Sequence, residues 1–449
     1  MGAGKSTIGQ EVAGLSGRPF VDLDREIERR HGSVAELFGR GEAEFRRVEE
    51  ELAAEVLASS TPAVIALGGG AVLSERTREL LLTDAFTLRV DIEVDDAWER
   101  VRGSGRPLAQ DETQFSRLFD ERQPLYEEVS AGLVDSAEDV LLEALQIDVE
   151  RGQLAELGNR LGESLEAVAV IADEHVLDLH PLSFDPASVH RVPRGEAAKT
   201  PAVLDRLWNE LGLDRRGTIV GYGGGSTTDV AGLAAATYMR GVRWVAVPTT
   251  LLGQVDAAIG GKTALDLTTG KNLVGAFHYP GKVIADPDVL ATLSAAQRRE
   301  GMAEVVKTGL IAGRPLWELE DEAMIRACAA FKAAVCLGDP FDQGRRAILN
   351  LGHTFAHALE AAAGYDGLAH GDAVALGLLA ALRLSGRPTD VVEEVLDPQP
   401  VRVDRDRAWA ALGRDKKRGL VLLGEDGAHW DVPVPADDVR RALDELISP

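Results

Sequence analysis

Short apolar runs alternate with helical patterns along most of the first 290 residues. Each run has the length of a buried strand and is bounded by turn-forming residues. Strands that alternate with helices predict an α/β fold with parallel strands, because each helix returns the chain to the same edge of the sheet. The predicted strands are Phe20–Asp22, Ala63–Leu67, Phe86–Ile92, Ala167–Ala172, Thr218–Gly221 and Trp244–Pro248.

The pattern changes between Glu300 and about Leu384, where long Ala- and Leu-rich stretches are helical in character and carry little strand signal. A helical region is therefore expected after the α/β part. A chain of 449 residues is too long for one ordinary core. We expect three domains, at residues 1–145, 146–295 and 296–449, although no Pro- or Gly-rich linker marks the first junction.

Composition narrows the class of protein. Hydrophobic residues make up 45% and charged residues 27% of the chain, as in soluble globular proteins. The net charge of −25 argues against nucleic acid or an anionic membrane as a partner, and no apolar run approaches the ~20 residues of a membrane-spanning helix. The two cysteines, Cys328 and Cys336, form no framework of pairs. They are expected to be packing residues in a cytoplasmic protein.

The chain opens with a Gly-rich turn before a helical pattern that starts at Ile8. Backbone N–H groups at such a helix start can cradle an anion. In a phosphate-binding loop, Lys5 would reach the phosphates of ATP and Ser6 would hold Mg²⁺. The full pattern also needs an earlier glycine and a strand, so this motif alone leaves a phosphate site and an ordinary helix start equally open. The candidate ATP-binding residues are Gly2, Ala3, Gly4, Lys5, Ser6 and Thr7.

Further motifs follow the turn in a fixed order. Taken singly, their aspartates could be helix caps and their arginines could form surface ion pairs. Taken together with the Gly-rich turn, the set resembles shikimate kinase over about residues 1–142. The motifs are Asp22-Leu-Asp24, Glu42-x-x-Phe-Arg46, Gly68-Gly-Gly70, Arg106-Pro-Leu108 and Arg122-Gln-Pro-Leu-Tyr126.

The resemblance implies a P-loop kinase-type parallel sheet and transfer of a phosphoryl group from ATP, with Mg²⁺, to shikimate. It implies that Asp24 holds the attacking hydroxyl, that Arg46 and Arg122 bind the carboxylate, and that Gly69 lies against the ring. Catalysis would then rest on positioning and charge neutralisation.

The same resemblance places Asp22 with Ser6 in the Mg²⁺ shell and Arg106 in a lid over the phosphates. The first strand of this fold lies in the middle of the sheet, so without it we expect unpaired backbone and an apolar gap. A true start upstream of Met1 is favoured over decay of the kinase, because the downstream site residues are all present. A module that binds shikimate or ATP without turnover is the alternative.

A second Gly-rich turn, from Tyr222 to Asp229, follows a predicted strand and opens a helical pattern. Its glycines allow backbone amides to approach the pyrophosphate of a dinucleotide. The turn lacks the G-x-G-x-x-G pattern, so a purely structural role stays open. The motifs that follow bring lysines, an aspartate and an asparagine together, which suits an anionic ligand in an otherwise acidic protein.

Metal-ligand residue types occur in the helical region. Glu304 and Lys307 lie one helical turn apart, as do His353 and His357, and His370 begins another segment. Taken alone, each histidine could be an ordinary hydrogen-bonded residue. A glutamate and two histidines with an open position suit a catalytic Zn²⁺.

About residues 193–418 resemble 3-dehydroquinate synthase. The motifs that carry the resemblance are Pro193-x-Gly-Glu196-x-x-Lys199, the second Gly-rich turn, Pro248-Thr-Thr-Leu-Leu252, Gln254-Val-Asp256, Gly260-Gly-Lys-Thr263, Gly270-Lys-Asn272, Gly301–Lys307, Leu349–His357, His370–Val374 and Arg414-Asp-Lys-Lys417. The departures from the family are Arg194, at a position that is often acidic, and Asp372, where Glu is common. The segment 147–192 matches poorly.

The resemblance implies a Rossmann-like α/β nucleotide-binding domain and an all-helical metal-binding domain. It implies Zn²⁺ (or Co²⁺) on Glu304, His353 and His370. The implied NAD-binding residues are Glu196, Lys199, Gly225, Ser226, Thr227, Thr228, Asp229, Thr249, Thr250 and Lys271. The implied substrate-binding and catalytic residues are Asp256, Lys262, Asn272, Lys307, Lys332, Arg346, Asn350 and His357, with Arg240 reaching across the interface of a homodimer.

The implied reaction converts 3-deoxy-D-arabino-heptulosonate 7-phosphate to 3-dehydroquinate and phosphate, with NAD regenerated in each turnover. The alternative on the same fold is a metal-dependent oxidoreductase of the glycerol dehydrogenase type. Its substrate carries no phosphate, so it would not need the lysines and arginine named above.

Overall fold

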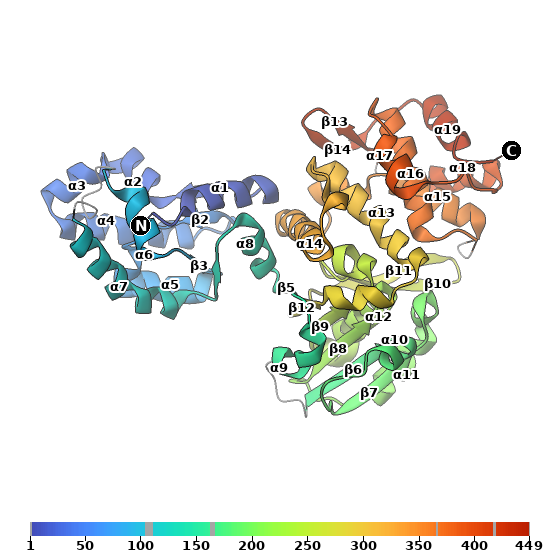
Figure 1. Cartoon of the computed structure of the whole chain (residues 1–449), viewed down its shortest axis with the longest axis horizontal. Helices are drawn as coiled ribbons and strands as arrows, with labels where there is room; N and C mark the ends of the chain where they lie inside the picture. Colours follow the sequence, from blue (N-terminus) through green and yellow to red (C-terminus); the bar gives the residue numbers. More distant parts are fainter. Residues whose placement is uncertain (1, 104–110, 162–166, 365–366, 416–418, 449) are drawn as a thin grey trace. The chain divides into compact units, whose positions relative to one another are not determined.

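The computed structural model of the chain describes residues 2–103, 111–161, 167–364, 367–415 and 419–448. The chain divides into two compact units, Met1–Ala144 and Leu145–Pro449 (Figure 1). Each unit has hydrophobic core clusters of its own. Within the described residues, every helix is too short or too polar to cross a membrane.

The N-terminal unit alternates helices with short parallel strands. Strands β1 and β2 pair with each other, and β3 pairs with β4. The elements are α1 (Lys5–Ser16), β1 (Phe20–Asp22), α2 (Leu23–His31), α3 (Val34–Arg40), α4 (Glu42–Leu57), β2 (Val64–Ala66), η1 (Ala71–Leu73), α5 (Glu75–Asp84), β3 (Leu88–Val90), α6 (Val94–Val101), α7 (Glu112–Val129), β4 (Gly132–Val134) and α8 (Ala137–Ala144).

Local capping sets the starts of the first helices. The Asp22 carboxylate at the end of β1 accepts a hydrogen bond from the Arg25 N–H and caps α2. Ser33 and Glu36 form a capping box at the start of α3. The apolar faces of α2, α3 and α4 then pack together around Leu23 and Phe45.

An apolar cavity of about 150 Å³ lies against both strand pairs of this unit. The residues lining it include Leu67 after β2, Leu88 and Val90 in β3, and Val129 before β4. The described strands therefore form two separate parallel pairs, and the cavity beside them is also lined by the predicted site residues Lys5, Gly69 and Arg122.

The α/β part of the C-terminal unit is built on a six-stranded parallel sheet with the order β5-β12-β9-β8-β6-β7. Its elements are β5 (Ile147–Val149), η2 (Gln153–Glu156), α9 (Leu157–Leu161), β6 (Val168–Asp173), α10 (Glu174–Leu179), β7 (Ser188–Val192), η4 (Gly195–Ala198), α11 (Pro201–Glu210), β8 (Thr218–Gly223), α12 (Gly225–Thr237), η5 (Tyr238–Arg240), β9 (Arg243–Pro248), η6 (Gly253–Ala257), the antiparallel hairpin β10 (Lys262–Leu267) and β11 (Gly270–Phe277), β12 (Lys282–Ala285) and η7 (Pro287–Thr292).

The sheet topology places a crevice above β6 and β8. The chain runs from β6 to the edge strand β7, then crosses back to β8 on the other side of β6. In open parallel sheets, ligands bind at the carboxyl ends of strands where the order reverses in this way. Strand β6 ends at Asp173 and β8 ends at Gly223. Both strands are buried throughout, which explains their continuous apolar sequences.

The rest of the unit is mainly helical, and Figure 1 shows it in yellow to red. A β-hairpin near its end was not predicted from the sequence. Its two strands pair antiparallel around a tight turn that is bounded by Gly424 and Gly427. The elements are α13 (Ala295–Ala312), η8 (Leu316–Glu318), α14 (Asp321–Gly338), η9 (Arg345–Asn350), α15 (His353–Ala363), α16 (His370–Leu384), α17 (Asp390–Leu396), α18 (Arg405–Asp415), β13 (Leu420–Gly424), β14 (Gly427–Val432) and α19 (Ala436–Asp444).

Candidate functional sites

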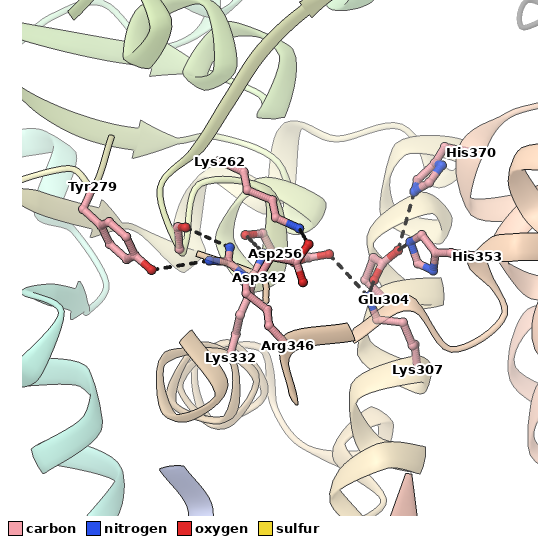
Figure 2. Close-up of polar contacts among 11 residues, drawn as sticks. Asp256, Lys262, Tyr279, Glu304, Lys307, Lys332, Asp342, Arg346, His353 and His370 are labelled. Atoms are coloured by element: carbon pink, nitrogen blue, oxygen red, sulfur yellow. Dashed lines mark hydrogen bonds and ion pairs between the residues drawn. The ribbon is translucent and has the colours of Figure 1, made fainter. Parts of the chain in front are cut away.

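Three side chains from three helices meet at the centre of the helical region. Glu304 lies on α13, His353 starts α15 and His370 starts α16 (Figure 2). The ligand atoms of the three residues all lie within 4.8 Å of one another. The Glu304 Oε1 atom is 3.4 Å from His353 Nε2 and 3.5 Å from His370 Nε2. Ligand atoms around a tetrahedral Zn²⁺ are about 3.4 Å apart, so the cluster has the dimensions of such a site.

The second ring nitrogen of each histidine faces an oxygen outside this cluster. His353 Nδ1 is 3.3 Å from the Leu351 carbonyl oxygen, and His370 Nδ1 is 3.3 Å from Glu360 Oε1. Metal-binding histidines usually have such partners, which fix the tautomer and the direction of the ring. Both rings therefore present Nε2 towards Glu304.

The Glu304 carboxylate is 1% exposed and forms an ion pair with Lys307, one turn further along α13. Burial opposes ionisation of Glu304, but Lys307, together with His353 and His370, outweighs it and holds the pKa of Glu304 well below its usual range. The carboxylate is therefore charged, as a metal ligand must be.

A second carboxylate, which is partly buried, lies beside this cluster. Asp256 Oδ2 is 3.5 Å from Lys307 Nζ, and Asp256 Oδ1 accepts from Lys332 on α14 (Figure 2). Burial would raise the pKa of Asp256, yet Lys307 and Lys332 together lower it. Lys307 and Lys332 therefore border the cluster of Glu304, His353 and His370, here called the metal-type cluster, on the side of the α/β part.

Lys262 and Arg346 lie next to this pair of lysines in Figure 2. Lys262 Nζ donates to Asp342 over 2.8 Å. The Arg346 guanidinium is 2% exposed and donates to the Gly260 carbonyl over 2.8 Å and to the Pro340 carbonyl over 3.1 Å. These bonds hold the cation beside the Gly260–Lys262 turn. Asn350 ends η9, the helix that carries Arg346.

A cavity of about 1210 Å³ lies at the carboxyl ends of the parallel strands. Its wall joins three groups that are distant in sequence: the Gly-rich turn, the β10–β11 hairpin and the starts of the metal-site helices. The predicted residues in the wall are Glu196, Lys199, Gly225, Ser226, Thr227, Asp229, Thr249, Thr250, Asp256, Lys271, Asn272, His357 and His370.

The Gly-rich turn lies between β8 and α12. A Cβ atom added to Gly225 would lie 2.8 Å from the Cβ of Ala257, so the turn has no room for a side chain there. Gly225, Ser226 and Thr227 at the start of α12 line the cavity, and a helix start can bind an anion through its backbone N–H groups. Thr228, also predicted at the nucleotide site, is buried and its hydroxyl donates to the Gly225 carbonyl.

Lys199 is the centre of a polar network on this wall. Its Nζ atom is 2.7 Å from Asp229, and it also donates to the Asn272 side chain. Burial opposes its charge, but Asp229 and Glu196 outweigh this effect and raise the pKa of Lys199. The Ser226 hydroxyl donates to Glu196 over 2.6 Å. The network links the Gly-rich turn to the hairpin.

Two of the predicted substrate residues, His357 and Arg240, lie in different places relative to the cavity. The His357 ring contacts His353 edge-on, with centroids 5.5 Å apart, and also faces the cavity. Arg240 follows the carboxyl end of α12. Because α12 runs antiparallel to the strands, this end of the helix lies at the amino ends of the strands, away from the cavity at their carboxyl ends. Arg240 is absent from the cavity wall formed by the described residues.

In the N-terminal unit, the predicted phosphate loop leads directly into α1. Gly2 and Gly4 have φ values of 76° and 89°, which only glycine adopts without strain. The Ser6 hydroxyl donates to Asp22 over 2.6 Å, so the two predicted Mg²⁺ ligands are in contact. Arg106 lies outside the described residues.

The predicted shikimate residues gather around Gly68–Gly70. Arg46 Nη1 donates to Glu49 over 2.5 Å, and Arg122 donates to the Gly69 carbonyl over 3.2 Å. A Cβ atom at Gly68 would lie 2.7 Å from the Asp24 carboxylate and 2.8 Å from that of Glu49. The Gly-rich turn after β2 therefore admits both acidic groups to the site.

Sequence reasoning missed three acidic residues at these sites: Glu49, Asp342 and Glu360. Glu49 is three residues after Arg46, and Glu360 is three residues after His357, so helical spacing could have indicated both. Asp342 lies in an irregular segment before η9 and gave no periodic signal.

Comparisons with known proteins agree with both halves of the chain. Residues 1–147 match the family model for shikimate kinase. Residues 189–300 match the 3-dehydroquinate synthase N-terminal model, and residues 301–399 match the 3-dehydroquinate synthase C-terminal model.

One relative spans both halves. The bifunctional shikimate kinase/3-dehydroquinate synthase of Thermotoga maritima is 35% identical over 410 residues, which cover 84% of this chain and 82% of that protein. Among solved structures, 2-deoxy-scyllo-inosose synthase complexed with carbaglucose-6-phosphate, NAD⁺ and Co²⁺ has a TM-score of 0.59 and 27% identity, over 67% of this chain and 96% of that one.

The 2-epi-5-epi-valiolone synthase of Streptomyces hygroscopicus, solved with NAD⁺ and Zn²⁺ bound, has a TM-score of 0.56 and 25% identity, over 67% of this chain and 96% of that one. The family models cover the kinase and synthase regions in turn, and the Thermotoga relative joins both in one chain. This chain therefore belongs to the bifunctional shikimate kinase/3-dehydroquinate synthase family.

Proposed function

We propose that the C-terminal unit converts 3-deoxy-D-arabino-heptulosonate 7-phosphate to 3-dehydroquinate and phosphate, and that the N-terminal unit phosphorylates shikimate with ATP. The observation that carries the synthase assignment is the Glu304–His353–His370 cluster, one member of which opens on the same cavity as the Gly-rich turn. This arrangement brings a metal site and a dinucleotide site to one substrate.

The cluster suits Zn²⁺ or Co²⁺, because its donors are one charged, buried carboxylate and two imidazole nitrogens at tetrahedral spacing. A bound divalent cation would polarise a substrate hydroxyl and ease its deprotonation. Glu304 supplies the negative charge of the site, and Lys307 keeps that charge in place. Mg²⁺, with ATP, is assigned to Ser6 and Asp22 in the other unit.

NAD is assigned to the cavity above β6 and β8. The start of α12 would receive the pyrophosphate, and Lys199 and Lys271 would lie along the cofactor. Asp173, at the end of β6, adds a carboxylate to the wall of this cavity. NAD would accept a hydride from the substrate carbinol and later return it, so that no net oxidation results.

The cations beside the metal-type cluster favour a phosphorylated substrate. Lys262, Lys307, Lys332 and Arg346 meet in one region of a chain whose net charge is −25. They would hold the anionic substrate and stabilise negative charge as phosphate leaves. A polyol dehydrogenase has no phosphate to bind, so this array argues against the glycerol dehydrogenase alternative.

The kinase assignment rests on the contact between Ser6 and Asp22 and on the group formed by Asp24, Arg46 and Arg122 around the Gly68–Gly70 turn. Arg46 and Arg122 would bind the shikimate carboxylate, and Asp24 would hold the attacking hydroxyl. The alternative is a module that binds shikimate or ATP without turnover.

We also propose a homodimer. Strand β11 exposes Val274 on one face and Leu273 and Phe277 on the other, and exposed apolar side chains can mark an interface. Arg240 lies at the edge of the sheet opposite the cavity, so it could contribute to a site only in a second copy. We expect Val274→Asp to convert a dimer to a monomer in sedimentation equilibrium. Unchanged mass for this variant would contradict the assigned surface.

Two assays on the purified chain test the catalytic assignments. We expect the heptulosonate phosphate, with NAD⁺ and Zn²⁺, to release one phosphate per substrate without accumulation of NADH. Accumulation of NADH without phosphate would instead support the dehydrogenase. We expect shikimate, ATP and Mg²⁺ to form ADP. Binding of shikimate in calorimetry with no ADP formed would support the non-catalytic module.

A further inference from the structure

Glu360 is a buried acid behind the metal-type cluster. It lies on α15, two turns after His353 and therefore on the same face of the helix. Glu360 is 4% exposed. A carboxylate at such a position costs free energy unless a partner compensates its charge. One such partner is His370, whose Nδ1 is 3.3 Å from Glu360 Oε1.

The two histidines of the cluster have different partners. His353 starts α15 directly after the Leu351 turn, and its Nδ1 faces a backbone carbonyl. His370 is the first residue of α16, and its Nδ1 faces the Glu360 side chain. Its side chain is 31% exposed, compared with 12% for His353. The more exposed ligand is therefore the one anchored by a carboxylate.

A second contact ties Glu360 to the nucleotide side of the cavity. Lys271 Nζ, at the start of β11, is 3.9 Å from Glu360 Oε1. Glu360, Lys271 and His370 line the same cavity. Lys271 and His370 both approach Oε1 of Glu360, and the positive charge of the lysine helps to keep this carboxylate ionised in a buried position.

We propose that Glu360 is a positioning residue that fixes the ring of His370 with Nε2 directed at the metal and increases its strength as a ligand. This inference rests on the proposed metal site of the synthase. In this role Glu360 is not a metal ligand: it acts through the His370 ring by accepting its Nδ1–H. A carboxylate partner holds the tautomer that leaves Nε2 free and makes the ring more basic than a neutral partner would.

The test is metal affinity, measured on the full chain without substrate. We expect Glu360→Ala to weaken Zn²⁺ binding by about 10–100-fold in competition with a chelator, as loss of such partners usually does. Glu360→Gln keeps the shape and one acceptor oxygen but loses the charge, so a smaller loss is expected. His370→Ala, which removes the ligand itself, gives the largest loss of Zn²⁺ affinity to be expected. Co²⁺ absorption should shift in both Glu360 variants, because it reports ligand geometry directly.

The control is Asp426→Asn, which changes a carboxylate 2.7 Å from His429 in the exposed β13–β14 hairpin. We expect it to bind Zn²⁺ as the unmodified chain does. Thermal melting of the metal-free variants checks folding, and Glu360→Gln is the deciding variant if Glu360→Ala does not fold. Zn²⁺ affinity within twofold of the unmodified chain in Glu360→Gln, with an unshifted Co²⁺ spectrum, would overturn this inference alone. Failure of the unmodified chain to bind Zn²⁺ would overturn the metal site itself.

Discussion

At the scale of single residues, the synthase site consists of buried charges that stabilise one another. Glu304, Lys307, Asp256 and Lys332 alternate in sign, so each desolvated charge has an opposite partner. Removing one member of such a set leaves an uncompensated charge, so we expect single substitutions here to affect both ligand binding and stability.

Glu304→Gln is expected to abolish metal binding at the cluster, because the amide lacks the charge that attracts the cation. We expect Zn²⁺ affinity to fall by at least about 100-fold and phosphate release from the heptulosonate phosphate to fall with it. ADP formation from shikimate serves as the internal control and should not change. Retention of full synthase activity would contradict the assignment of Glu304.

Glu49 in the kinase-like unit gives a prediction for pH. Burial raises the pKa of Glu49 above its ordinary value of 4.5, although Arg46 opposes the shift. The folded state then binds the proton more tightly than the unfolded state does, so this group's contribution to stability falls as pH rises above about 4.5 and through the raised pKa.

Glu49→Gln should therefore increase the free energy of unfolding of the N-terminal unit at pH 7 and flatten its dependence on pH above about 4.5. Calorimetry of the intact chain at several pH values measures both quantities. The unfolding transition of the N-terminal unit is identified as the one that shifts when shikimate is added. Glu51→Gln, on the exposed face of the same helix, is the control and should leave both quantities unchanged. A less stable Glu49→Gln variant at pH 7 would show that the Arg46 ion pair dominates.

At the scale of elements, helix starts and tight turns position the ligand-binding groups. The loops that follow β6 and β8 meet because the strand order reverses between them, and α12 begins where β8 ends. Sequence patterns identified both strands and the Gly-rich turn. They did not name the short strands β5, β7 and β12 or the β10–β11 hairpin, because a strand of three to five residues resembles many other short segments.

Gly225→Ala tests the turn. The added methyl group would lie 2.8 Å from the Ala257 Cβ and in the path of the pyrophosphate, so we expect NAD⁺ to bind at least about tenfold more weakly. Fluorescence titration with NAD⁺ measures this. Gly413→Ala, where a Cβ meets nothing within 4 Å, is the matched control. Equal NAD⁺ affinity in the two variants would argue against a cofactor at this turn.

At the scale of the whole molecule, the chain joins two units that each carry a core and a candidate site. Shikimate phosphorylation does not directly follow 3-dehydroquinate formation, since the product of the synthase must first be dehydrated and reduced. Direct transfer between the two sites is therefore not required by the chemistry. The division after Ala144 leaves β5 with the C-terminal unit, where it pairs with β12.

A fragment that starts at Leu145 is expected to fold and to retain Zn²⁺ binding and synthase activity, because the sheet, the helical core and the metal cluster all lie within it. Phosphate release per mole of fragment should match that of the full chain within about twofold. A folded, Zn²⁺-loaded fragment without activity would indicate that the synthase depends on the N-terminal unit.

The sequence by itself determined the α/β character, the strands that carry the Gly-rich turns and the family to which the chain belongs. These features depend on neighbours along the chain, since helical spacing and strand-end motifs are local. The resemblance already implied that Glu304, His353 and His370 share a metal site, and the tertiary structure brings them together. Only the tertiary structure decided that Glu360 stands behind His370 and that Lys262 pairs with Asp342. Such contacts join distant segments, and packing between helices sets them, which no local pattern encodes.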